Sequence, residues 1–313
     1  MFEIKRYEPS HEQAWNDFVT RSKNGTFLFD RRFMDYHSDR FADSSLMILR
    51  KGRIYALLPA NRVGDTLHSH QGLTYGGLLT DAKATAEGVM EAFGTLNAWL
   101  RNEGVRRVTY KAMPWIYHRL PAEEDLYALT QVCHARLLTR EISSTILLQQ
   151  PLRFTESRKS GLRKALREGL YMEESGDLAA FWQMLDDNLA SRHHTHPVHS
   201  LDELRLLQGR FPQQIHLYLI YNKEKEPVGG TWVFDAGQVV HTQYIASTKE
   251  GKAHGALDLL FDELINRRYR EGIYLDFGKS TEEGGRVLNE HLIFQKEGFG
   301  GRGVCYDTYE WKP

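Results

Sequence analysis

The feature that most constrains how this chain can fold is a repeated order of predicted elements. Its second half shows three strand-like runs, an amphipathic helix and a further strand, at residues 215–221, 227–234, 238–246, 253–271 and 273–277. The first half shows the same order, and the two patterns align at an offset of roughly 170 residues. The sequence therefore predicts two copies of one fold, with a first unit over residues 1–150 and a second over residues 151–313.

The predicted fold class is α+β, built in α/β layers. Each unit is expected to hold a mixed, mostly antiparallel sheet flanked by helices, because short turns separate its first three strands and a long helix precedes the next one. A helix over 281–298 and a strand over 303–311 are expected to complete the second unit. A basic amphipathic helix over 153–169 is expected at the start of that unit.

Composition excludes several classes of protein. The 313 residues are 41% hydrophobic and 26% charged, and 40 Lys and Arg against 41 Asp and Glu give a net charge of -1. A chain with no overall positive field is not expected to bind DNA, so polyanion binding would need a local basic patch. Two cysteines, Cys133 and Cys305, are too few for a disulfide framework.

The distribution of apolar residues predicts a cytoplasmic protein. The first residues carry charges where an export signal needs an apolar run of about 7–15 residues. No stretch approaches the roughly 20 apolar residues that span a bilayer, so no membrane span is expected. The sequence leaves open whether the chain is a monomer or a homodimer.

Motifs in the second half resemble those of a known fold. They are Tyr244-Ile-Ala-Ser-Thr248, His254-Gly-Ala256, Asp276-Phe-Gly-Lys-Ser280, Leu288-Asn289 and Lys296-Glu-Gly-Phe-Gly300, preceded by the basic segment Arg158-Lys-Ser-Gly-Leu-Arg-Lys-Ala165. With the order of elements, they resemble the GNAT acyltransferase fold in the tandem form of Fem-type aminoacyltransferases and their acetyltransferase-like relatives. The resemblance implies two GNAT-like units and the transfer of an acyl or aminoacyl group to an amine.

The resemblance also implies where an acyl donor binds. It assigns acyl-CoA to the strand end and the following loop, at Tyr244, Ala246, Ser247, Thr248, His254, Gly255 and Ala256. A strand that runs through a glycine-containing loop into a helix presents backbone N–H groups and a positive dipole end to a pyrophosphate. The loop departs from the family pattern at Leu257, where the family has Gly or Ala. The alternative interpretation is an ordinary connection in which Gly255 allows close packing.

Acyl transfer to an amine needs proton transfer and a polarised carbonyl, so charged residues beside the predicted donor strand are candidate catalytic groups. We expect these roles for Asp276, Lys279, Glu282 and His241. The alternatives are structural: Asp276 as an acceptor for loop N–H groups, Glu282 as a helix N-terminal charge, and His241 as a core histidine. No G-x-S-x-G elbow occurs and neither cysteine has a nucleophile signature, so direct attack without a covalent intermediate is expected.

Other residues are candidates for substrate binding. His194 and His196 lie in a segment with four histidines between residues 193 and 199, where Pro197 imposes an extended loop; substrate contact or a solvated loop is expected there, and no metal. Arg163 lies on the basic helix, which is either a solvated face or a platform for phosphates or a tRNA acceptor stem. His70 and Tyr75 either line an acceptor cleft or belong to a strand with a flexible end.

The expected function is transfer of an acyl group from an acyl-CoA-type donor to a small-molecule or peptide amine in a cleft of the second unit. Two alternatives stay open at this point. One is a Fem-like transfer from aminoacyl-tRNA to a peptidoglycan precursor, which makes tRNA a possible partner. The other is a non-catalytic ligand-binding protein that keeps the same fold.

Overall fold

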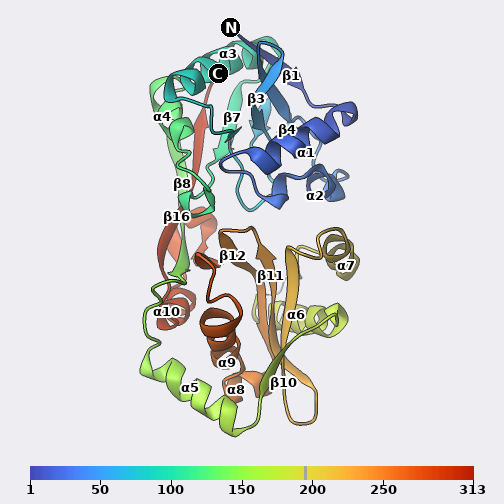
Figure 1. Cartoon of the computed structure of the whole chain (residues 1–313), viewed down its shortest axis with the longest axis vertical. Coiled ribbons are helices and arrows are strands. Elements are labelled where there is room, and N and C mark those ends of the chain that lie inside the picture. The colour runs from blue at the N-terminus through green and yellow to red at the C-terminus, as the bar shows by residue number, and fades with distance from the viewer. Residues whose placement is uncertain (194–195) are drawn as a thin grey trace. The chain divides into compact units, whose positions relative to one another are not determined.

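The chain forms two compact units that do not coincide with its two sequence halves. The computed structural model describes residues 1–193 and 196–313. Unit 1 comprises Met1–Glu141, Thr281–Val287 and Cys305–Pro313, and unit 2 comprises Ile142–Ser280 and Leu288–Val304. Two long strands, β8 (Arg136–Leu147) and β16 (Arg302–Trp311), contribute residues to both units (Figure 1). The predicted division after residue 150 into separate domains stays a prediction.

Unit 1 contains two groups of strands. An antiparallel sheet has the order β1-β2-β3-β6, formed by Phe2–Arg6, Leu46–Arg50, Arg53–Leu58 and Leu79–Thr80. A second group has the order β4-β5-β7-β16-β8, in which the first three strands are Asn61–Val63, Thr66–His68 and Arg107–Lys111. Only the β5–β7 pairing among those described in unit 1 is parallel.

The helices of unit 1 bury its apolar core. They are α1 (Glu12–Arg21), α2 (Arg31–Met34), α3 (Ala86–Asn102) and α4 (Glu124–Gln131), with 3₁₀ turns η1 (Pro9–His11), η2 (Phe27–Phe29), η3 (Asp35–His37) and η4 (Trp115–Tyr117). The Thr85 side chain accepts a hydrogen bond from Gly88 N and so caps α3. From there the helix places Phe93 against Tyr110 and Trp311 in the core.

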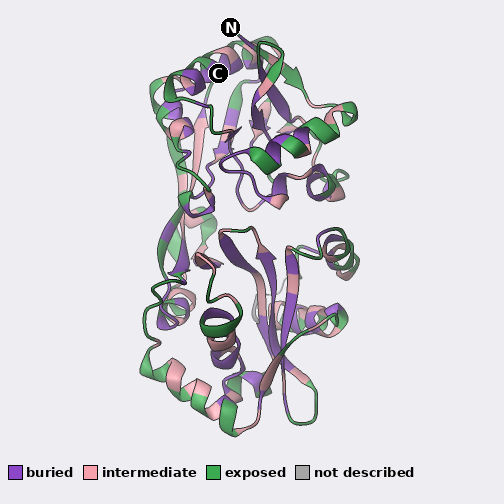
Figure 2. Ribbon diagram, in the orientation of Figure 1, coloured by how far each residue is buried: buried purple, intermediate pink, exposed green. Residues whose placement is uncertain are grey.

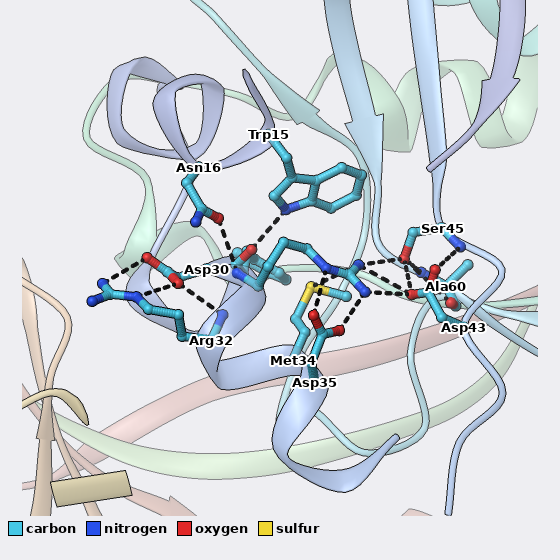
Figure 3. Close-up of polar contacts among 11 residues, drawn as sticks. Trp15, Asn16, Asp30, Arg32, Met34, Asp35, Asp43, Ser45 and Ala60 are labelled. Carbon is cyan, nitrogen blue, oxygen red and sulfur yellow. Dashed lines mark hydrogen bonds and ion pairs between the residues drawn. The ribbon is translucent and has the colours of Figure 1, made fainter. Parts of the chain in front are cut away.

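A buried arginine also holds unit 1 together. The Arg31 side chain is only 2% exposed, and its guanidinium lies 3.8 Å from the centroid of the Tyr7 ring. It pairs with Asp35 and with Asp43, where the Nη1 to Oδ1 distance is 3.1 Å (Figure 3). A buried charge needs such partners because its desolvation is expensive, so this network fixes α2 against the start of β2.

Unit 2 is built on one mixed sheet. Its strand order is β9-β10-β11-β12-β13 followed by β8, and the new strands are Tyr171–Glu174, Ile215–Tyr221, Pro227–Asp235, Val239–Ser247 and Tyr274–Lys279. The β12–β13 pairing is parallel, and the other described pairings of β9 to β13 are antiparallel. The three predicted strands of the second half therefore match β10, β11 and β12 closely.

The helices of unit 2 cover this sheet. They are α5 (Glu156–Arg167), α6 (Leu178–His193), α7 (Leu201–Arg210), α8 (Lys249–His254), α9 (Ala256–Glu263), a π-helical turn η5 (Leu264–Arg268) and α10 (Glu290–Gly298). Both α6 and α9 pack against β11, which is buried at every residue from Val228 to Phe234. Figure 2 shows this burial along the central strands. The Val, Thr, Trp and Phe residues of β11 are typical of a buried strand, which explains why this one was predictable.

Two predicted helices were wrong in part. Residues 281–289 form β14 (Thr281–Glu282), the turn η6 (Glu283–Gly285) and β15 (Val287–Leu288), so the helix predicted from residue 281 begins only with α10. Gly284 and Gly285 take positive φ values of 64° and 89°, which a right-handed helix cannot contain. The helix predicted over 253–271 starts at α8 and breaks at Gly255, whose φ is 78°.

Candidate functional site

The sheet of unit 2 opens between its two parallel strands. Strands β12 and β13 pair only from Val239–Tyr274 to His241–Asp276. Beyond that pair both strands lose their register: Gln243 is an extra residue in β12, and β13 shifts against β8 between Asp276 and Lys279. Because bulges bend a strand and increase its twist, the two strands separate at this point.

A cavity of about 340 Å³ lies at this opening. Its walls come from α6, the end of β12, α8, α9, β13 and α10. The lining residues are Leu185, Asn188, Leu189, Ile245, Ala246, Ser247, Lys252, Leu257, Phe261, Phe277, Leu292, Gln295, Lys296 and Phe299. A second cavity of about 530 Å³ shares Asn188, Ser247 and Lys252 with it. A large apolar cavity with a few polar groups is the usual form of a ligand site.

Lys296 is the one strongly buried charged residue among the lining residues. Its side chain is 5% exposed, and Nζ donates hydrogen bonds of 2.8 Å and 2.9 Å to the carbonyl oxygens of Gly278 and Lys279. Burial lowers the pKa of Lys296 to about 8, although the charge of Asp276 acts in the opposite direction. The amine therefore titrates close to neutral pH, in the range where a group can both donate and accept a proton.

Beside this lysine, His241 and Asp276 form a buried pair. His241 Nδ1 lies 2.8 Å from Asp276 Oδ2, and the other carboxylate oxygen accepts hydrogen bonds from Ser143 Oγ at 2.5 Å and Thr145 Oγ1 at 2.7 Å. Burial raises the pKa of Asp276, but the hydrogen bonds and the His241 charge outweigh it and hold the pKa below its usual value. The carboxylate is fully buried, so it can orient the His241 ring but cannot contact a substrate directly.

The other two predicted catalytic residues lie differently. Lys279 is exposed at the end of β13, and its carbonyl, not its amine, contacts Lys296. Glu282 is exposed on β14, which belongs to unit 1. The structure therefore brings together His241 and Asp276, places the Lys279 backbone beside them, and puts Glu282 in the other compact unit.

The predicted donor-binding residues divide into two sets. Ala246 and Ser247 line the cavity at the sheet opening, and Ser247 and Thr248 line the adjoining one. Tyr244 lines neither; its hydroxyl lies 2.5 Å from His199 Nδ1, and burial raises the pKa of Tyr244 to about 12. His254, Gly255 and Ala256 do not line the described cavities.

The backbone of the predicted pyrophosphate loop faces a helix of the protein itself. A Cβ added at Gly255 would lie 2.3 Å from the carbonyl oxygen of Gly161 in α5. Leu257, where the family pattern has Gly or Ala, places its side chain in the cavity wall. Close packing is therefore sufficient to explain Gly255, and its predicted donor contact stays a prediction.

Of the predicted substrate-binding residues that the structure describes, none lines the cavity at the sheet opening. Arg163 is exposed on α5, and His196 is exposed with its Nδ1 2.7 Å from Asp186 Oδ1. His70 and Tyr75 are each 2% exposed inside unit 1, so they are enclosed side chains there. His194 lies outside the described residues. The substrate roles of all five stay predictions.

Sequence reasoning missed Lys296 and the hydroxyl pair Ser143 and Thr145. The available signal for Lys296 was its spacing, since it follows Leu292 by four residues on the half-buried face of α10. The two hydroxyls had no signal in the sequence, because only the β8–β13 register places them beside Asp276.

The described side chains and helices bear on the expectations about metals and membranes. Among the side chains that the structure describes, no group of three or more His, Cys, Asp or Glu is arranged to hold a metal ion. No helix in the described part of the chain is both long enough and apolar enough to cross a membrane.

Comparisons with known proteins identify the fold. The family model described as an acetyltransferase (GNAT) domain matches residues 155–284. No curated protein matches the chain in sequence. The solved structure of FemX is similar, with a TM-score of 0.68 and 11% identity over 99% of this chain and 97% of FemX.

Two further solved structures are similar over nearly the whole chain. L-PGS from Bacillus licheniformis has a TM-score of 0.62 and 13% identity, over 98% of this chain and 92% of that one. A tandem GNAT protein from the clavulanic acid biosynthesis pathway has a TM-score of 0.52 and 11% identity, over 100% and 98% of the two chains. The predicted mixed α/β fold with two GNAT-like units is thereby confirmed.

Proposed function

From the tandem GNAT-like fold of the Fem type, we propose that this protein transfers an acyl group to an amine, with the acyl group held between β12 and β13 of unit 2. The observation that carries the proposal is the opening of the sheet beyond His241–Asp276 onto a cavity that Lys296 lines. A site where two strands part beside titratable groups provides both space for a donor and acid–base chemistry.

The proposed reaction is a direct displacement. The amine nitrogen forms a bond to the donor's carbonyl carbon, and the bond from that carbon to the carrier's sulfur or oxygen breaks. His241 accepts the proton that the amine loses. Asp276 orients this ring: when Nδ1 carries the proton and donates it to Oδ2, the proton-accepting nitrogen is Nε2.

Lys296 is proposed to stabilise the charge that the displacement creates. Its ammonium has three N–H groups, two of which the carbonyl oxygens of Gly278 and Lys279 accept. The third N–H is left for the carbonyl oxygen of the donor and then for the leaving group, which needs a proton. Gly278 also lies against His241, because a Cβ added at Gly278 would be 3.3 Å from His241 Cε1. The Lys296 amine and the His241 ring therefore both lie beside Gly278.

An acyl thioester of the coenzyme A type is the donor we propose, with its acyl group in the cavity and its arm along Ser247 and Thr248 in the adjoining one. The acceptor is a small-molecule or peptide amine. Because Gly255 packs against Gly161, we expect the diphosphate of such a donor to be held by other groups than this loop.

Aminoacyl-tRNA is a second candidate donor that one observation favours. Arg163 and Arg167 are exposed on α5, so these two basic side chains of the helix face solvent. A tRNA that used this face would bind with an affinity that falls steeply with salt, because counterions are released from its phosphates. Binding of bulk aminoacyl-tRNA at about 50 mM and about 200 mM salt distinguishes this candidate from a thioester user.

The proposal is tested by a transfer assay with a panel of acyl-CoA donors and amine acceptors, using His241→Gln. Removing a positioned proton acceptor is expected to lower the rate about 10²- to 10⁴-fold. His216→Gln is the matched control, because His216 also lies beside a carboxylate, 2.7 Å from Glu174, but on β10, which pairs with β9 and β11 and not with β13. Full activity in His241→Gln would remove the catalytic assignment. Donor binding without transfer to any amine would favour a non-catalytic binding protein.

A further inference from the structure

The walls of the cavity in unit 2 carry information about the group that it binds. Phe261 and Phe277 pack with their ring centroids 4.8 Å apart, and Phe299 lies 4.9 Å from Phe261. All three rings are at most 3% exposed, so they form a fixed aromatic wall of the cavity. Such a surface gains free energy by removing methylene groups from water.

The charged groups of the cavity are of one sign. Among the lining residues that the structure describes, Lys252 and Lys296 are the charged ones, and none is Asp or Glu. Lys252 Nζ donates to Asn188 Oδ1 at 2.6 Å, which holds that amine to a polar cluster with Ser247, whose carbonyl accepts from Asn188. At the buried end of the cavity, beside Lys296, a ligand with an ammonium group would lose its water and find no carboxylate among the described lining residues, which is unfavourable.

The size of the cavity sets the length of chain that it can enclose. An apolar cavity of about 150 Å³ holds one benzene ring of six carbons. A cavity of about 340 Å³ therefore encloses roughly a dozen carbons when it is completely filled. A thioester carbonyl near Lys296 takes part of that space.

We infer that the cavity between β12 and β13 binds an uncharged aliphatic acyl chain of about eight to twelve carbons, and that it rejects acetyl and aminoacyl groups, which excludes aminoacyl-tRNA as the donor. The inference rests on the proposed function for the reaction that the chain undergoes. Chain binding can still be measured without any transfer, so the two statements can fail separately.

Titration calorimetry of the full-length protein with acetyl-, butyryl-, octanoyl-, dodecanoyl- and hexadecanoyl-CoA tests the inference. We expect Kd to fall about fourfold for each added methylene until the cavity is full, and then to level off. The sharpest comparison is octanoyl-CoA against 8-aminooctanoyl-CoA, which differ by one terminal amine. We expect the amine to weaken binding at least about hundredfold. Equal affinities in this pair, or acetyl-CoA as tight as octanoyl-CoA, would overturn the inference.

A variant checks that the chain occupies this cavity. Leu189→Trp adds a large ring to the lining from α6, and should move the chain-length optimum to shorter chains by about two to four carbons. Leu206→Trp is its control, at an exposed position of α7 and outside the lining. An unchanged optimum in Leu189→Trp would also overturn the inference. Binding that depends on chain length, without transfer, supports the inference and contradicts the proposed function. Equal transfer from acetyl-CoA and 8-aminooctanoyl-CoA supports the proposed function and contradicts the inference.

Discussion

The buried amine of Lys296 links the stability of unit 2 to pH. Its pKa is about 8 in the folded protein and 10.5 when unperturbed, so the unfolded chain holds more protons between these pH values. Below pH 8 the unfolding free energy is therefore lowered by the full cost of burying the charged amine. It should rise by up to about 3 kcal/mol as pH increases to 10.5. We expect Lys296→Met to lack this rise, measured as the difference between the urea denaturation curves of the two proteins at pH 7 and pH 10.5. A constant difference would contradict the lowered pKa.

In unit 1, the arginine network shown in Figure 3 offers a matched pair of substitutions. Arg31→Met removes the buried member of the pairs with Asp35 and Asp43 and is expected to cost about 1 to 3 kcal/mol, because Asp43 and the buried Ser45 lose a hydrogen-bond donor. Arg32→Met removes an adjacent arginine that is 56% exposed and pairs with Asp30, and should cost at most about 1 kcal/mol. Urea denaturation measures both, and equal losses would show that the Arg31 network does not stabilise unit 1.

At the level of elements, the contact between α5 and Gly255 is open to a direct test. Gly255→Ala introduces a Cβ 2.3 Å from Gly161 O at a φ of 78°, and we expect a loss of about 2 to 5 kcal/mol. Gly237→Ala is the control, because Gly237 has a φ of 86° but open space around it, and should cost only about 1 to 2 kcal/mol. Hydrogen exchange should quicken in α5 only in the first variant. Similar exchange in both would show that the contact does not hold α5.

The sequence predicted correctly those elements whose conformation depends on neighbouring residues in the chain. Strands β10, β11 and β12 were predictable because short runs rich in β-branched and aromatic residues lie between turn residues. The segment 281–289 was not, because its apolar spacing fits a helix while the left-handed Gly284 and Gly285 exclude one. The break at Gly255 has a tertiary cause, since α5 approaches that residue from a distant part of the sequence.

The candidate site shows the same limit. His241 and Asp276 were chosen from their positions on separate predicted strands, but their hydrogen bond depends on the β12–β13 register. Lys296 was missed because a lysine on a half-polar helix normally faces solvent. It is buried here because the irregular end of β13 offers two carbonyl oxygens to its amine.

For the whole molecule, the repeat in the sequence correctly predicts two GNAT-like units. The two compact units, however, share the strands β8 and β16, each of which contributes residues to both. The second part of β8 pairs with β13, from Leu147 opposite Tyr274 to Ser143 opposite Lys279. It also supplies the hydroxyl groups of Ser143 and Thr145 to Asp276. A cut after residue 150 would remove both from unit 2, leaving β13 with an unpaired edge and a buried carboxylate with two fewer donors.

Two fragments test this consequence. A fragment of residues 142–304 contains all of unit 2, whereas a fragment of residues 151–313 lacks the β8 residues that pair with β13. We expect the first to unfold cooperatively on heating and the second to show no cooperative transition, because losing the buried donors to Asp276 alone costs about 1 to 3 kcal/mol each, a large part of a domain's stability. Circular dichroism at increasing temperature measures this. If the fragment 151–313 unfolded cooperatively at the same midpoint, the predicted boundary at residue 150 would hold and the shared strand would not be required for folding.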